Sequence, residues 1–272
     1  MIKSNIKKAA EARTAQDVHA ETVSPEEKKA LAAASGAADP KALGAPRASL
    51  LPAMSTDNRG FEEEVDQSDL IIPRVKLLQT NSPELKEYHD LRAGMLINSL
   101  TKEVLPSTFV PVFYYKEWMR FNPREKEKRG FLPEHKPGAL IWRTRDAQDP
   151  RIITECAFGP AGEKPLAITM LNFFSIFEGD GMPVIVSFGV TSYKAGKNLL
   201  SLAKLRGGAM FSRRYKLSVK EESNEKGDYY VLRVDPNGDC DAETFKIVEN
   251  YFNQFAMKRD NLKTHIEDEA GL

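Results

Sequence analysis

Only two cysteines, Cys156 and Cys240, occur in the sequence of 272 residues. Two thiols are too few for a disulfide framework in a chain of this size, so we expect free thiols in a reducing compartment. No apolar run approaches the roughly 20 residues that a membrane-spanning helix needs. No apolar segment follows the N-terminal methionine, as it would in a secretory signal. These absences predict a cytoplasmic protein that does not contact a membrane.

Motifs for catalysis and cofactor binding are also missing. Residues 189–198 resemble a phosphate-binding loop, but Thr191 replaces its first glycine and Asn198 replaces the magnesium-binding hydroxyl. A segment that starts like a calcium loop carries Cys240 in place of the glycine and Lys246 in place of the bidentate glutamate. The four histidines lie at no metal-ligand spacing to one another or to a cysteine. We therefore predict no catalytic residue, no metal site and no cofactor, and a protein that is not an enzyme.

Aromatic residues are absent from the chain before Phe61. Residues 1–60 are rich in Ala, Lys, Glu, Ser and Pro, and such a composition buries too little apolar surface to offset the entropy of the chain. We interpret residues 1–60 as a flexible, disordered arm and residues 61–258 as one folded domain. Residues 259–272 form an acidic C-terminal tail.

The folded domain has mainly the pattern of β-strands separated by Gly and Pro. Val, Ile, Phe, Tyr and Trp are enriched in six predicted strands: 108–115, 139–145, 166–177, 183–190, 214–220 and 228–234. Residues 70–78 mix apolar runs with a proline, which suggests an edge element or a short entry from strand to helix. The strand pattern predicts a mainly β fold, an antiparallel barrel or a sandwich.

Two segments have helical periodicity instead and make the predicted fold α+β. The first spans about 193–206, behind Thr191 or Ser192 as cap, and two glycines end it. The second spans about 242–258 and begins after Asp241 as its cap. Its predicted apolar stripe consists of Phe245, Val248, Phe252 and Phe255. The domain is therefore expected to carry added helices and to close with a C-terminal helix.

The chain is electrically balanced, with 39 basic and 39 acidic residues, yet no acidic residue occurs between Gly181 and Lys220. A segment of this kind can create a local positive field that holds a polyanion. Its cations are Lys194, Lys197, Lys204, Arg206, Arg213, Arg214, Lys216 and Lys220. Helical periodicity places Lys194, Lys197 and Lys204 opposite the apolar residues of the first helix, and strand alternation places Arg214, Lys216 and Lys220 on one face of the strand. We expect the helix face and the strand face to form one cationic groove; a solvated surface is the alternative.

Residues 113–121 place five aromatic rings among two cations. Single-stranded nucleic acid presents unstacked bases to aromatic rings and phosphates to cations, and each stacked base contributes about 1–3 kcal/mol. Alternation along a strand prevents all five rings from being exposed, so Phe113 is expected in the core. The expected nucleic-acid contacts in this segment are Tyr115, Trp118 and Arg120.

Several segments of the chain resemble a known group of phage proteins. They are Ile72–Gln79 with Ser82–Glu84, Gly94–Leu105, Phe109–Val112 and Thr191–Lys197. Together, over about residues 70–255, they resemble the bacteriophage single-stranded DNA-binding proteins with an oligonucleotide/oligosaccharide-binding (OB) barrel. The resemblance implies an OB-like antiparallel β-barrel, a place in phage DNA replication or recombination, and the host cell cytoplasm as location. Many of these proteins end their acidic tail in Phe, whereas this chain ends in Leu272, so recruitment of partners by the tail does not carry over directly.

The leading hypothesis is a non-catalytic protein that holds single-stranded DNA, without sequence specificity, in a basic groove lined by aromatic residues. Its other expected partners are replication or recombination proteins that contact the acidic tail, and copies of the chain in a homo-oligomer. The tail could equally be a frayed, solubilising end. The second hypothesis is a structural or host-interaction protein that uses the basic patch on an acidic partner. The third is an annealing or nuclease-like recombination enzyme.

Overall fold

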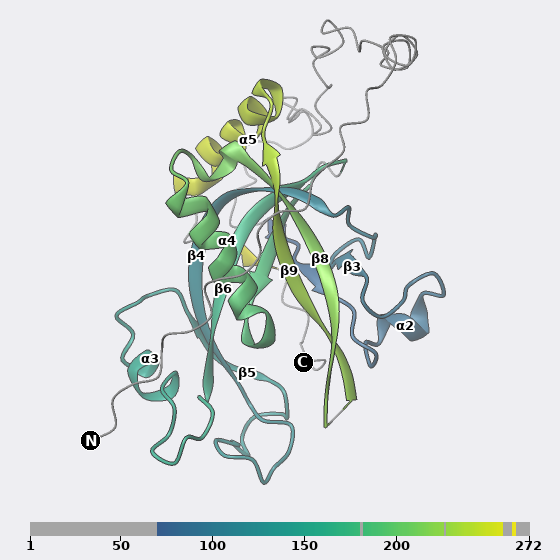
Figure 1. Cartoon of the computed structure of the whole chain (residues 1–272). Helices are drawn as coiled ribbons and strands as arrows, with labels where there is room; N and C mark the ends of the chain where they lie inside the picture. Colours follow the sequence, from purple (N-terminus) through teal and green to yellow (C-terminus); the bar gives the residue numbers. More distant parts are fainter. Residues whose placement is uncertain (1–69, 180–181, 226, 258–262, 265–272) are drawn as a thin grey trace, which may run out of the picture. The chain divides into compact units, whose positions relative to one another are not determined.

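The computed structural model describes residues 70–179, 182–225, 227–257 and 263–264 (Figure 1). The predicted arm, residues 1–60, lies outside the described residues, and so does the acidic tail apart from the short strand β10, Lys263–Thr264. Among the residues described, no helix is both long enough and apolar enough to cross a membrane.

The main sheet has six strands, all joined by antiparallel pairing. Its strands are β4 (Thr108–Phe121), β5 (Leu140–Thr144), β6 (Ala167–Phe177), β7 (Pro183–Phe188), β8 (Arg213–Asn224) and β9 (Gly227–Asp239). Five of them follow the order β7-β6-β4-β8-β9, and β5 pairs with β4 beside this path. Each of these strands overlaps a segment that the sequence predicted. The hairpin β8–β9 extends well into the predicted loop 221–227.

Smaller elements surround the main sheet. The strands β2 (Val75–Leu77) and β3 (Leu96–Asn98) pair antiparallel, while β1 (Ile71–Ile72) pairs in parallel with β10. The helices are α2 (Glu84–Glu87), α3 (Pro150–Glu155), α4 (Tyr193–Leu205) and α5 (Ala242–Phe255). The mainly β, α+β class is therefore confirmed, whereas the helices α2 and α3 were not predicted.

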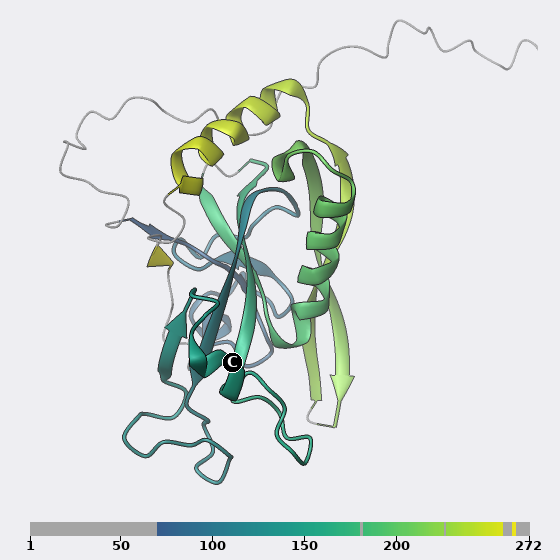
Figure 2. The same cartoon turned by 90° about the vertical axis from the view of Figure 1, so that its left-hand side faces the viewer.

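The sheet does not close into a barrel within the described residues. Its outer strands β7 and β9 have no ladder to each other. Helix α4, which connects β7 to β8 in sequence, packs against both of these outer strands, and Figures 1 and 2 show it running alongside the β8–β9 hairpin. A helix about 10 Å across holds the two strands farther apart than the 4.7–4.9 Å spacing of a ladder. The closed OB-like barrel is thus not present in this part of the chain.

Strand β4 organises the sheet because both of its edges are used. One edge pairs with β6 along nearly its whole length. The other edge pairs with β8 at Thr108 and Phe109 and with β5 from Trp118 to Phe121. Pro111 cannot donate a ladder hydrogen bond, and it lies at a register shift between Pro111 and Phe113. Because the pairing with β5 extends to Phe121, the observed strand β4 is six residues longer than the predicted strand 108–115.

Alternating side chains build a separate core on each face of the sheet. We call one the α5-side core; it joins helix α5 to Val110, Val112, Phe113, Tyr115, Phe174, Ile176 and Ile185. We call the other the α4-side core; it joins Leu199 of α4 to Phe109, Leu171, Phe173, Phe188, Tyr215, Leu217 and Leu232. On β7, Ile185 belongs to the first core, and its neighbours Val184 and Val186 belong to the second. This alternation is the signature of a sheet buried on both faces.

Helix α5 begins where the sequence predicted, because the Asp241 carboxylate accepts a hydrogen bond from the Thr244 amide at 2.8 Å. Its buried side differs from the predicted stripe. Val248 and Phe255 are buried as expected, but Ile247 and Tyr251 are buried in place of Phe252, which is 38% exposed. The Phe252 ring still lies 5.3 Å from the Phe211 ring at the margin of the core.

Helix α4 approaches β7 so closely that only glycine fits at one position. A Cβ atom at Gly196 would lie 2.6 Å from Cβ of Phe188 and 3.1 Å from Cδ1 of Leu171. Because the Phe188 Cβ is attached directly to the backbone of β7, it cannot swing away as the end of a long side chain could. Gly196 therefore sets the distance between helix and sheet.

We expect Gly196→Ala to destabilise the protein by about 1–3 kcal/mol, because overpacking outweighs the better helix propensity of alanine. The free energy of unfolding from urea titration measures this effect. Ser201→Ala, on the exposed side of the same helix, is the matched control and should change it by less than about 0.5 kcal/mol. An unfolding free energy of Gly196→Ala at or above that of the wild type would contradict the close approach.

Candidate nucleic-acid interface

The outer face of α4 carries exposed cations. Lys194, Lys197, Lys204 and Arg206 are all exposed, and the helix contains no acidic residue. The Lys197 ammonium lies 5.4 Å from the centre of the Tyr193 ring. No ion pair joins any of these four cations to a carboxylate within the described part of the chain. We call these four residues the α4 basic face.

The amphipathic sequence of α4 and its first residue orient this face. Leu199 and Ala203 are buried against the sheet. Lys194 and Lys204 lie five residues from Leu199 and Lys197 lies two residues from it, so all three lysines fall on the opposite side of the helix. Ser192 occupies the N-cap position, but its hydroxyl does not cap the helix. It accepts instead a hydrogen bond from the buried Leu232 amide of β9 at 3.1 Å. This bond fixes the start of α4 to the neighbouring strand.

The cations of β8 have a different environment, because acidic residues outside the acid-free segment lie next to them. Arg213 lies 3.4 Å from Asp239, and Arg214 lies 3.4 Å from Glu178. Lys220 lies 3.1 Å from Glu222, while exposed Lys216 stands opposite Asp235 in the ladder. The positive segment of the sequence is therefore largely neutralised in space along β8.

Lys216 and Lys220 of β8 also point to the side of the sheet opposite the α4 basic face. Tyr215 and Leu217 are both 1% exposed and belong to the α4-side core, as the predicted alternation requires. The side chains of Lys216 and Lys220 consequently leave the strand on the side away from α4. Lys216 and Lys220 therefore do not share a groove with the α4 basic face.

The predicted aromatic contacts are buried. Tyr115 is 6% exposed in the α5-side core, where the Arg145 guanidinium lies 4.5 Å from its ring centre. Burial raises the pKa of this tyrosine, and the neighbouring Arg145 opposes that shift. Trp118, 9% exposed, packs with Trp142 and Ala167. Neither ring offers a face on which a base could stack.

Arg120 is held by two contacts of its own. It lies 3.1 Å from Glu155 and donates a hydrogen bond of 2.8 Å to the Gly130 carbonyl oxygen. Its guanidinium therefore joins the loop after β4 to helix α3. Of the eleven residues predicted to contact nucleic acid, four are exposed along α4 and at its C-terminal end, those of the α4 basic face.

The sequence analysis missed a buried charge cluster centred on Glu117. This carboxylate is fully buried, and its oxygens lie 3.4 Å from Arg74 and 3.1 Å from Arg145. Arg143 makes a further ion pair, and the Asn172 amide donates a hydrogen bond of 3.3 Å. Strand alternation could have indicated the burial, since Glu117 shares a face with Tyr115. The cluster ties β4, β5, β6 and the segment before β2 together.

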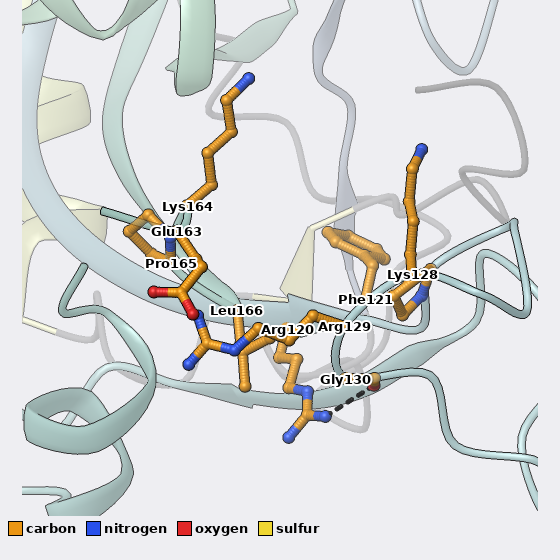
Figure 3. Close-up of a pocket in the computed structure, with 10 residues that line it drawn as sticks. Arg120, Phe121, Lys128, Arg129, Gly130, Glu163, Lys164, Pro165 and Leu166 are labelled. Atoms are coloured by element: carbon orange, nitrogen blue, oxygen red, sulfur yellow. Dashed lines mark hydrogen bonds between the residues drawn. The ribbon is translucent and has the colours of Figure 1, made fainter. Parts of the chain in front are cut away.

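A pocket of about 300 Å³ opens where β4 ends and β6 begins (Figure 3). Its apolar lining includes Phe121, Pro123, Pro165 and Leu166, and its cations are Arg120, Lys128, Arg129 and Lys164. Glu163 is the one acidic residue of the lining. Gly130 has φ +83°, and a Cβ there would lie 2.6 Å from Cδ2 of Leu166. The pocket thus combines a basic rim with an apolar wall.

The Pam3 phage gp34-like proteins are a family whose pattern matches residues 39–260. The chain belongs to this family. The phage part of the sequence-based resemblance is thereby confirmed. No curated protein matches the chain. No solved structure matches it.

The gp34-like region covers every element from β1 to α5, and with them the α4 basic face, the Glu117 cluster and the pocket. No group of three or more His, Cys, Asp or Glu side chains that could hold a metal ion occurs among the residues with described positions. Both cysteines are free thiols. Burial raises the pKa of Cys240 to about 12. This thiol is therefore protonated, and a poor nucleophile, at neutral pH.

Proposed function

We propose that this phage protein binds single-stranded DNA without sequence specificity and without catalysis, in the host cell during replication or recombination. The observation that carries the proposal is the α4 basic face, four exposed cations on an acid-free stretch with no ion pair to a described carboxylate. Such cations are hydrated in the free protein and can exchange water and counterions for phosphates.

The spacing of the cations suits a linear polyanion. Lys194 and Lys204 are ten residues apart on α4, which corresponds to about 15 Å along the helix axis. Lys197 lies between them, and Arg206 follows directly after the helix. A single strand could therefore contact several cations in sequence along one ridge. The half-buried ring of Tyr193 lies beside Lys197 and is an aromatic side chain next to this ridge.

A fluorescent oligo-dT should bind the purified protein tightly at low salt and dissociate as salt is added. Four phosphate contacts predict a slope of about −3 for log K against log salt, from about 0.7 per contact on a single strand. Fluorescence anisotropy at several salt concentrations measures this slope. Failure to bind oligo-dT at low salt would overturn the proposal.

The same basic face could instead bind an acidic protein, and the salt titration separates these functions. A protein of that class would form a stoichiometric complex with its partner but leave oligo-dT unbound. An annealing or nuclease-like enzyme would change the DNA itself. Incubation with labelled DNA and magnesium, followed by gel electrophoresis, should leave the DNA intact, and cleavage products would contradict the non-catalytic role.

A further inference from the structure

The pocket at the end of β4 carries less net positive charge than the α4 basic face, because carboxylates lie next to most of its cations. Arg120 is paired with Glu155, and the Lys128 ammonium lies 2.6 Å from Glu125. The Glu163 carboxylate accepts a hydrogen bond of 3.0 Å from the Ala161 amide. Backbone hydrogen bonds, and to a smaller extent the nearby Arg129, lower its pKa, so it is ionised at neutral pH.

Summing these charges leaves the pocket with one positive charge. The four lining cations face three carboxylates, those of Glu163, Glu155 and Glu125. Figure 3 shows Arg129 reaching toward Glu163, while Lys164 and Lys128 extend on either side of the opening. Lys164 is exposed and has no ion pair to a carboxylate in the described chain. One phosphodiester carries the single negative charge that this surplus matches.

The wall of the pocket suits a flat, largely apolar group. Phe121, Pro123, Pro165 and Leu166 are all half-buried, so part of each side chain remains open to the pocket. A volume of about 300 Å³ lies at the lower end of the range of small-molecule sites. Together, the wall and the surplus charge fit one base and its phosphate better than a purely inorganic anion.

The pocket and the α4 basic face are connected over the surface of the sheet. Leu166 precedes β6, and Leu171, five residues further, would touch a Cβ placed at Gly196 of α4. Five residues of strand span about 17 Å. Lys116 pairs directly with Leu171 in the ladder, so it projects on the same side of the sheet as α4, and it is exposed. It is therefore an exposed cation on the same side of the sheet, level with the point where α4 packs against Leu171.

From these positions we infer that the pocket is a second contact for the same DNA strand and holds one nucleotide. Lys164 and Arg129 bind its phosphate, and its base lies against Phe121 and Leu166. The strand then passes Lys116 to reach the α4 basic face. This inference rests on the proposed function, because it concerns the strand that α4 binds.

The test compares Arg129→Ala/Lys164→Ala with Lys126→Ala/Lys136→Ala. The second variant removes the same charge from exposed residues of the loop after β4 that do not line the pocket. Binding is measured with oligo-dT of about four and about sixteen nucleotides, which bracket the site sizes of such proteins. The pocket variant should bind the longer oligonucleotide about tenfold more weakly, and its salt slope should fall by about 0.7, because one phosphate contact is lost. The shorter one, which α4 alone can hold, should change less than about twofold.

The amide resonance of Gly130 in the wild-type protein should also shift when the longer oligonucleotide binds, since Gly130 lines the pocket. Equal affinity of the two variants for the longer oligonucleotide, or an unmoved Gly130 resonance, would overturn the inference while leaving the proposed function intact. A wild-type protein that binds neither oligonucleotide would overturn the proposed function itself.

Discussion

Replacing Lys194, Lys197 and Lys204 together by alanine is expected to weaken binding of oligo-dT roughly a hundredfold, since each contact contributes about 1 kcal/mol. The loss of three contacts should also lower the salt slope by about 2. The side chains are exposed on the outer side of α4, so folding should be unaffected. Anisotropy titrations at several salt concentrations measure both quantities.

The matched control is Lys86→Ala/Arg92→Ala/Lys246→Ala, which removes the same charge from exposed residues outside α4. A general effect of net charge would weaken binding by both triple variants alike. A wild-type salt slope in the α4 variant would show that the strand binds elsewhere. In that event the cations of β8 become the next candidates, despite their carboxylate neighbours.

Replacing Glu117 by glutamine should have the largest effect on stability, about 3–5 kcal/mol, because it removes the carboxylate that the buried Arg74 shares with the half-buried Arg143 and Arg145. The substitution keeps the shape of the side chain and changes only its charge. Arg74 is itself 6% exposed, so it cannot turn to solvent without opening the core. Urea unfolding, followed by circular dichroism, measures the loss.

Glu134→Gln removes the same charge from an exposed loop and should change the free energy of unfolding by less than about 0.5 kcal/mol. A similarly small effect at Glu117 would mean that the arginines are held by other contacts. DNA binding offers a second readout. Because the Glu117 cluster is remote from the exposed side of α4, the folded fraction of Glu117→Gln should keep the salt slope of the wild type.

The elements that could be predicted from the sequence are those with a strong local signal. Asp241 caps α5, and the glycines after Arg206 follow the end of α4. The predicted alternation on β8, with Tyr215 and Leu217 buried and Lys216 exposed, was also correct. Caps and strand alternation depend only on residues close in sequence, which is why the sequence reveals them. The short helix α3 was missed, although Asp149 caps it and Pro150 starts it. At six residues it shows too little periodicity to stand out.

The candidate site could be predicted only in part. The basic residues of α4 were found because one helix displays its own polar face. The aromatic residues Tyr115 and Trp118 were misplaced because a run of rings looks the same in a core and on a binding surface. Their burial follows from β4 lying inside the sheet, between β6 on one edge and β5 and β8 on the other. No pattern of neighbouring residues in the sequence shows that a strand will lie inside the sheet and not at its edge.

The sequence by itself determined the mainly β character of the domain, the amphipathic helices and the acid-free stretch from Gly181 to Lys220. Only the tertiary structure decided which of those cations keep an uncompensated charge. Periodicity and composition act between close neighbours in the chain, whereas charge compensation depends on distance in space. Glu178 and Asp239 lie outside the acid-free stretch and far from β8's arginines in sequence, yet folding places them beside Arg214 and Arg213. The lysines of α4 face solvent instead, and the proposed function rests on that difference.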